Sequence, residues 1–106
     1  ATDIHLIRFG LFNMQEAPLE PVNMVRPVEL IFPDGTHILS ARFGEALKTS
    51  PKIDDTPAVQ GGRVTLPTFR MDPRSTVIFD LIVQGDAHPE RVLGEAEGHG
   101  PVKRIL

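Results

Sequence analysis

Residues 76–83 read Thr-Val-Ile-Phe-Asp-Leu-Ile-Val, and this stretch decides the class of fold. Side chains along a β-strand alternate between its two faces. One face of this stretch is entirely apolar, whereas Asp80 interrupts the other face. The pattern therefore predicts a strand whose buried face consists of Val77, Phe79, Leu81 and Val83.

Comparable short runs recur along the chain, at 4–12, 28–32, 38–47, 63–66, 92–96 and 102–106. The 9 glycines and 10 prolines are spread between the runs. Short apolar runs bounded by turn residues are typical of all-β sandwiches and barrels. The first run carries apolar side chains on both faces, which predicts a central strand. The stretches 13–27 and 49–62 are expected to be loops, the second with a short edge strand near Ile53 or Ala58.

The clearest turn signal is Pro33-Asp34-Gly35-Thr36, between the runs 28–32 and 38–47. Proline presets φ, the aspartate side chain bonds to nearby backbone, and glycine adopts positive φ. The sequence therefore predicts a β-hairpin at this point, with Gly35 at positive φ. A further turn is expected at 71–75.

Helix-forming residues gather only at 45–48 and 89–96, and neither stretch has the length and caps of a helix. We therefore expect one domain over residues 1–106. The favoured fold is all-β, an antiparallel immunoglobulin-like β-sandwich of about seven strands, ahead of a small β-barrel. Its core is expected to include Phe32, Phe43, Phe79, Leu81 and Val83.

The composition argues against several classes of site. The chain has no cysteine, which rules out disulfides, thiolate zinc sites and a cysteine nucleophile. Its formal net charge is -3, its basic residues are scattered, and it has no Trp or Tyr, so nucleic-acid binding is disfavoured. No run approaches the roughly 18 apolar residues of a membrane span. The first residues show no signal peptide, so we expect a soluble domain that does not insert into a membrane.

Metal-ligating residues are present but not at metal-binding spacing. No two histidines stand three or four residues apart, and each lies in a different segment, so no metal site is expected. The pair most worth comparing is His88 and His99, which flank the run 92–96 and should lie at opposite rims; the others are His5 and His37. Asp54-Asp55 and Asp34-Gly35 lack the ligand pattern of a calcium loop and are interpreted as turn residues.

Catalytic motifs are likewise not found, and we expect neither catalytic nor cofactor-binding residues. No serine lies in a Gly-x-Ser-x-Gly elbow, the three being Ser40, Ser50 and Ser75. Glu95 and Glu97 fall on the outer face of an expected strand, where carboxylates are usually solvated. The spacing of Gly94, Gly98 and Gly100 fits no phosphate-binding loop, because no helix follows to present its N–H groups.

The order of strands and turns resembles bacterial domains of unknown function, often actinobacterial, with immunoglobulin-like sandwich folds. The likeness rests on an opening strand followed by Asn13, the Phe32-to-Gly35 turn, the short strand before the Asp72-Pro73 turn, and the closing segment 94–104. Such domains occur in membrane-anchored or multidomain proteins. The resemblance implies a non-enzymatic accessory module and assigns no functional residue.

Three functions are consistent with the sequence. The favoured one is a non-catalytic interaction, spacer or sensing module of a larger bacterial protein, with a protein partner. The second is a free-standing domain that binds a small ligand, which a deep apolar pocket with converging polar groups would support. The third is a small β-fold enzyme or metal protein, which clustered histidines and carboxylates would support.

Overall fold

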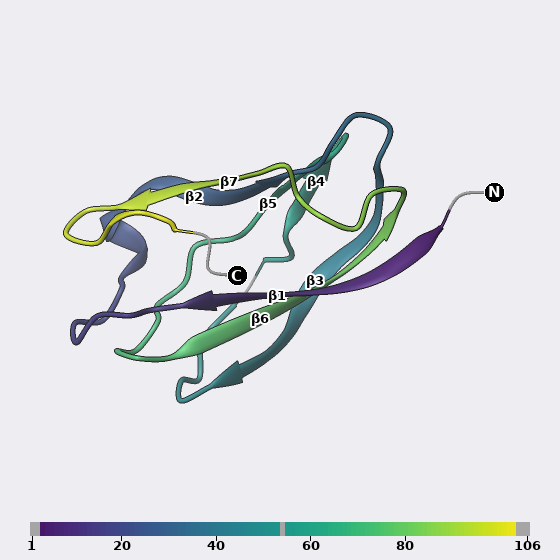
Figure 1. Cartoon of the computed structure of the whole chain (residues 1–106). Helices are drawn as coiled ribbons and strands as arrows, with labels where there is room; N and C mark the ends of the chain where they lie inside the picture. Colours follow the sequence, from purple (N-terminus) through teal and green to yellow (C-terminus); the bar gives the residue numbers. More distant parts are fainter. Residues whose placement is uncertain (1–2, 54, 104–106) are drawn as a thin grey trace.

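The structure is a computed structural model that describes residues 3–53 and 55–103. Within these residues the chain forms eight β-strands in two antiparallel sheets that pack against each other (Figure 1). The all-β, antiparallel β-sandwich expected from the sequence is therefore confirmed. The alternative of a β-barrel is wrong, because the two sheets share no strand and do not close on each other.

The three-stranded sheet consists, in spatial order, of β1 (Ile4–Phe12), β6 (Thr76–Gln84) and β3 (His37–Leu47). The stretch that decides the fold class thus forms the central strand. Its inner face is fully buried, as expected. Phe9 of β1 and Phe43 of β3 lie in register with Phe79, one on each side of β6.

β1 is an edge strand, so the prediction of a central strand at 4–12 is wrong. Its inner face packs against the core through Ile7, Phe9 and Leu11. On the outer face, Ile4 and Leu6 are 64% and 70% exposed. Apolar side chains on both faces indicate what a strand contacts above and below, but they do not specify neighbours in the plane of the sheet.

The second sheet holds β4 (Ala58–Gln60), β5 (Arg63–Thr65), β2 (Met24–Ile31), β7 (Arg91–Ala96) and β8 (Gly100–Pro101), in that spatial order. The edge strand expected near Ala58 is confirmed as β4. β2 begins within the stretch expected to be a loop and includes Pro27. A shift of the β2–β7 register between Arg26 and Glu29 accommodates this proline, which cannot donate to the ladder.

The turn predicted at Pro33-Asp34-Gly35-Thr36 is confirmed, but the prediction that it joins two paired strands as a β-hairpin is wrong. The Thr36 N–H donates to the Pro33 carbonyl oxygen at 3.2 Å, and Gly35 has φ of 90°. However, β2 pairs with β5 and β7, whereas β3 pairs with β6, so the turn carries the chain from one sheet to the other. Turn chemistry specifies a reversal of direction but not the sheet that the returning strand joins. The turn at Gly61-Gly62 instead joins paired strands, β4 and β5.

Most of the expected core is confirmed, because Phe32, Phe79, Leu81 and Val83 are buried. Phe43 is the exception and is 40% exposed. Its ring meets the Phe79 ring edge-on at a centroid distance of 6.2 Å, but β3 is an edge strand and leaves the far side of the ring uncovered. A bulge between Ile38 and Ser40 also interrupts the alternation of faces along β3, and Leu39 is exposed.

The final strand expected at 102–106 is not found in its described part. β8 covers Gly100–Pro101, and Val102 and Lys103 follow it outside any strand. Residues 104–106 lie outside the described residues. The described chain contains one short 3-10 helix, Pro21–Asn23, and no α-helix. It therefore has no helix long enough to cross a membrane.

Candidate functional site

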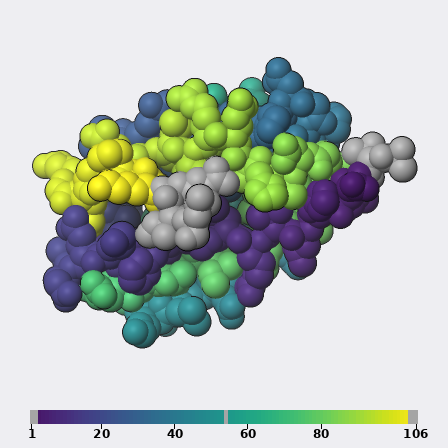
Figure 2. All heavy atoms as spheres, in the orientation of Figure 1, coloured from purple at the N-terminus to yellow at the C-terminus, as the bar shows by residue number. Residues whose placement is uncertain are grey.

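A groove opens where the edges of the two sheets face each other, between β1 and the β7–β8 segment. Figure 2 shows these segments, purple and yellow, on the same side of the molecule. The groove has a volume of about 720 Å³, within the range of small-molecule and cofactor sites. We call it the edge groove.

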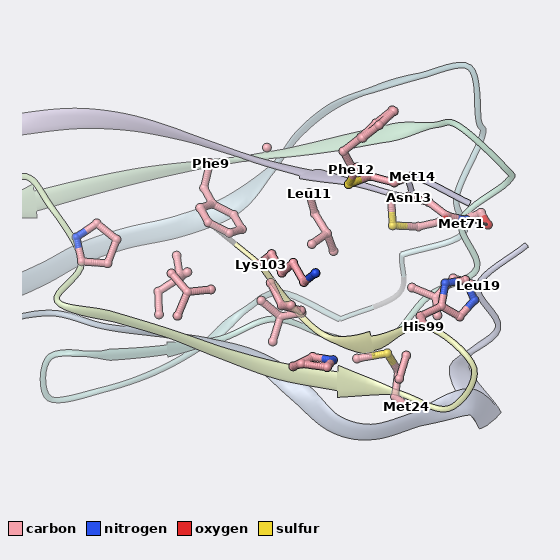
Figure 3. A pocket seen from close by; sticks show the side chains of 18 of the residues that line it. Phe9, Leu11, Phe12, Asn13, Met14, Leu19, Met24, Met71, His99 and Lys103 are labelled. Carbon is pink, nitrogen blue, oxygen red and sulfur yellow. Dashed lines mark hydrogen bonds between the residues drawn. The ribbon is translucent and has the colours of Figure 1, made fainter. Parts of the chain in front are cut away.

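The walls of the edge groove are the inner faces of the two sheets. Phe9 and Leu11 project from β1 into the space between them, whereas Phe12 points away (Figure 3). The opposite wall comes from β2, β7 and the segment after β8, and its apolar side chains are Val28, Leu30, Val92, Ala96 and Val102. The groove is therefore a continuation of the hydrophobic core that neither sheet covers.

One end of the edge groove is rich in methionine. Met14, Met24 and Met71 all line it, and they are the three methionines of the chain. Met71 is fully buried, Met24 is half-buried and Met14 is exposed, so they run from the floor of the groove to its mouth. Methionine is flexible and polarizable, and it suits surfaces that must fit irregular apolar partners.

Asn13 fixes the chain at this end. Its buried amide Nδ2 donates to the carbonyl oxygens of Ala17, Met71 and Asp72 at 3.0, 3.4 and 3.3 Å, and its Oδ1 accepts from the Gln15 N–H at 3.2 Å. The Gln15 Nε2 in turn donates to the Gly98 carbonyl oxygen at 3.4 Å. These bonds tie the end of β1 to the turn before β6 and to the β7–β8 turn.

The charges that line the edge groove are of one sign. The ionisable residues among the described lining are Arg8 and Lys103 with His88 and His99, and the described lining contains no carboxylate. Lys103 is exposed and makes no ion pair within the described chain. The Arg8 side chain is ion-paired with Asp80 and Glu45, so Lys103 is the cation that gives the groove a basic rim, in a protein whose net charge is negative.

The edge of β1 that borders the groove has unpaired backbone groups. Two hydrogen bonds show which residues of β1 bond to β6. The Gly85 N–H donates to the Asp3 carbonyl oxygen, and the Asn13 N–H donates to the Ser75 carbonyl oxygen, so the odd-numbered residues of β1 are the bonded ones. In an antiparallel pair, bonded and non-bonded positions alternate. The N–H and C=O groups that point away from β6 therefore belong to Ile4, Leu6, Arg8, Gly10 and Phe12. The described residues offer these groups no backbone or side-chain partner.

An ion-pair network crosses the outer face of the three-stranded sheet. Arg8 Nε donates to Asp80 Oδ1 at 2.9 Å, and Arg8 Nη2 lies 3.2 Å from Glu45 Oε1. The hydrogen bond to Asp80 is the main cause that raises the pKa of Arg8 above its ordinary value. Arg42 stands on the other side of Asp80 in the register of β3. The row Arg8, Asp80, Arg42 thus alternates in charge across the sheet.

The four histidines do not come together. His5 lies on β1 and His37 begins β3, while His88 precedes β7 and His99 follows it. His88 and His99 both line the edge groove, but at opposite ends of a six-residue strand, which spans about 20 Å. The described residues hold no group of three His, Asp or Glu suited to a metal ion. That the domain binds no metal stays a prediction.

The other residues that the sequence singled out have structural partners or are exposed. The Ser75 hydroxyl is fully buried and donates to the Asp72 carbonyl oxygen at 2.6 Å. Asp34, Asp55, Ser50, Glu95 and Glu97 are exposed, Ser40 lies on the outer face of β3, and Asp54 lies outside the described residues. Gly98, in the β7–β8 turn, and Gly100, the first residue of β8, both have positive φ.

The edge groove itself was missed by the sequence reasoning. Its lining comes from segments about 90 residues apart in the chain, and each lining run is an ordinary apolar strand. The apolar side chains on both faces of 4–12 do not reveal the groove, because they do not show whether the strand has a neighbour on each side in the sheet.

No protein-family model, no curated protein and no solved structure matches this chain. The fold and the edge groove define an antiparallel β-sandwich that is open along one side. The open side is the feature that separates this domain from a fully closed sandwich.

Proposed function

We propose that this domain is a non-catalytic interaction module that binds an apolar segment of a protein partner in the edge groove. The observation that carries the proposal is the groove of about 720 Å³ between two sheet edges that no further described strand covers, lined by core-type side chains. Contiguous apolar surface of this kind marks interaction sites. The resemblance to bacterial accessory domains supports a role within a larger bacterial protein.

The lining supports binding more than chemistry. Phe9, Leu11 and Val92 supply contact area, and the three methionines supply adaptability at one end. The Asn13 amide at the end of the groove is engaged in holding the backbone. It is therefore not free to activate a substrate.

A small apolar ligand is the second candidate, because the volume is also suitable for one. Its discriminating feature would be an enclosed pocket with converging polar groups. The edge groove is instead bordered along one side by backbone groups of β1 that have no partner among the described residues. This feature favours a peptide over a small molecule.

The apolar dye anilinonaphthalene sulfonate tests whether the edge groove binds apolar molecules. We expect saturable dye fluorescence, with affinity lowered about tenfold by Leu11→Gln, because the side chain that is lost lines the groove. The matched control is Leu6→Gln on the outer face of the same strand, where Leu6 is 70% exposed. Circular dichroism verifies that both variants are folded. Non-saturable binding, or equal affinities in all three proteins, would contradict the proposal.

A further inference from the structure

We propose that the partner segment enters as an added β-strand, which pairs with the free edge of β1 and carries a carboxylate opposite Arg8. This inference rests on the proposed function and names the partner as an extended peptide with alternating side chains. In β-strand addition, main-chain hydrogen bonds supply affinity and alternate side-chain positions supply specificity.

The free edge supplies the hydrogen bonds. Arg8, Gly10 and Phe12 direct their N–H and C=O groups away from β6, and they also line the edge groove. A long, apolar, unprotected edge strand is a template for pairing with another strand. The edge strand β1 has nine residues, no proline, no bulge in its ladder with β6, and no Asp, Glu, Lys or Arg on its inner face. It lacks these features that commonly protect an edge.

The groove supplies the side-chain pockets. A strand added beside β1 continues the pleat of the three-stranded sheet, so its inward side chains lie beside Phe9 and Leu11. They would fill the space in front of Val92 and Val102 on the facing sheet. Alternate apolar residues in the partner would thereby complete the open side of the sandwich.

The outer face specifies the charge. Arg8, Asp80 and Arg42 form a cross-strand row of alternating sign. A carboxylate on the added strand beside Arg8 extends this alternation, and opposite charges on neighbouring strands stabilise pairing. On the outer face of β1, the residues two positions before and after Arg8 are Leu6 and Gly10. The outward side chains of the partner should therefore be apolar beside Leu6, acidic beside Arg8 and small beside Gly10.

A second copy of this chain is the less suitable partner. The antiparallel register that overlaps two β1 strands completely is centred on Arg8, because β1 spans Ile4–Phe12. It places the two Arg8 side chains opposite each other, and like charges in that position are destabilising. The basic rim at Lys103 also favours an acidic partner.

The probe is a synthetic peptide in which inward valine and isoleucine alternate with outward valine, glutamate and threonine. Phe9→Trp places a fluorophore in the edge groove of a protein that otherwise has no Trp or Tyr. Phe43→Trp is the matched control, because it occupies the same row on the far side of Phe79. We expect the peptide to cause a saturable change in the emission of the Phe9→Trp protein and no change in the emission of the control.

Two changes isolate strand pairing from groove occupancy. N-methylation of the peptide groups that face β1 should weaken binding about tenfold or more, because it removes hydrogen-bond donors. Gly10→Pro should do the same from the protein side, whereas Gly10→Ala should not, since an added Cβ meets its nearest neighbour only at 3.8 Å. If both changes leave affinity unaltered while the Phe9→Trp fluorophore still responds, strand addition is wrong and groove binding stands.

The charge is tested separately. Replacing the outward glutamate of the peptide with lysine should weaken binding about fivefold. In the Arg8→Gln protein, the glutamate and lysine peptides should bind with equal affinity. Equal affinities of both peptides for the protein with Arg8 intact would overturn the assignment of the carboxylate. A response of the Phe9→Trp protein to the fatty acid oleate, with none to the peptide, would overturn the peptide partner altogether. If the protein binds neither the peptide nor oleate nor the dye, the proposed function itself is wrong.

Discussion

The Val102 side chain occupies the space into which a side chain at Gly94 would project. The Val102 N–H donates to the Gly94 carbonyl oxygen at 2.9 Å, and a Cβ on Gly94 would lie 2.9 Å from Val102 Cγ2. Gly94 also has φ of 149° and would place its Cβ 3.2 Å from the Val28 backbone. A glycine in the middle of β7 therefore holds the segment after β8 against the core and sets one wall of the edge groove.

Gly94→Ala should lower the free energy of unfolding by about 1–3 kcal/mol, through backbone strain and displacement of Val102. Urea denaturation measures the loss, and Gly98→Ala controls for backbone strain without a clash, since Gly98 also has positive φ, 81°, but a Cβ there has no neighbour within 4 Å. Adding Val102→Ala to Gly94→Ala should recover part of the stability. A double variant no more stable than Gly94→Ala alone would show that Val102 is not the obstacle.

Asn13→Ala should lower the free energy of unfolding by about 2–3 kcal/mol, because three carbonyl oxygens lose an amide donor in a buried place. Asn13→Asp should be at least as harmful at neutral pH, since a carboxylate keeps the shape but repels those oxygens. Acid should partly restore its stability, because a protonated carboxyl can donate. Thermal denaturation at two pH values checks this, and an Asp variant as stable as the unaltered protein would refute the role of the amide.

Phe79→Ala and Phe43→Ala should differ widely in cost although the two rings touch. Phe79 is fully buried on the central strand, so its loss should cost about 3–5 kcal/mol. Phe43 is 40% exposed on an edge strand, and its loss should cost about 1–2 kcal/mol. Chemical denaturation of both variants decides the matter, and similar midpoints would mean that the ring of Phe43 is as well covered as that of Phe79.

Gly35→Val should cost about 1–3 kcal/mol, because φ of 90° strains a β-branched residue. No atom lies within 4 Å of a Cβ at this position, so the cost comes from the backbone and not from a clash. Gly35→Asn should cost less, since asparagine tolerates positive φ better. An equal denaturation midpoint for the valine and asparagine variants would contradict this explanation.

Local pattern was sufficient for most of the strands and for the sandwich class. The run 76–83 alternates so regularly that its buried face could be read directly, and the Pro33-to-Thr36 turn follows from the chemistry of its residues. The sequence could also show that no motif for metal or nucleophilic chemistry is present within one segment. These properties depend on neighbours a few residues away, which the sequence contains.

The partners of the strands were decided by tertiary structure. Phe43 has the same alternation as Phe79, but only the sheet order makes one an edge residue and the other a core residue. The turn at Gly35 reverses the chain equally well within one sheet or between two. The edge groove arises because β1 and β8, at opposite ends of the chain, both lack a further neighbour among the described strands. By itself the sequence determined which faces are apolar, whereas long-range packing decided which of those faces the fold would leave open.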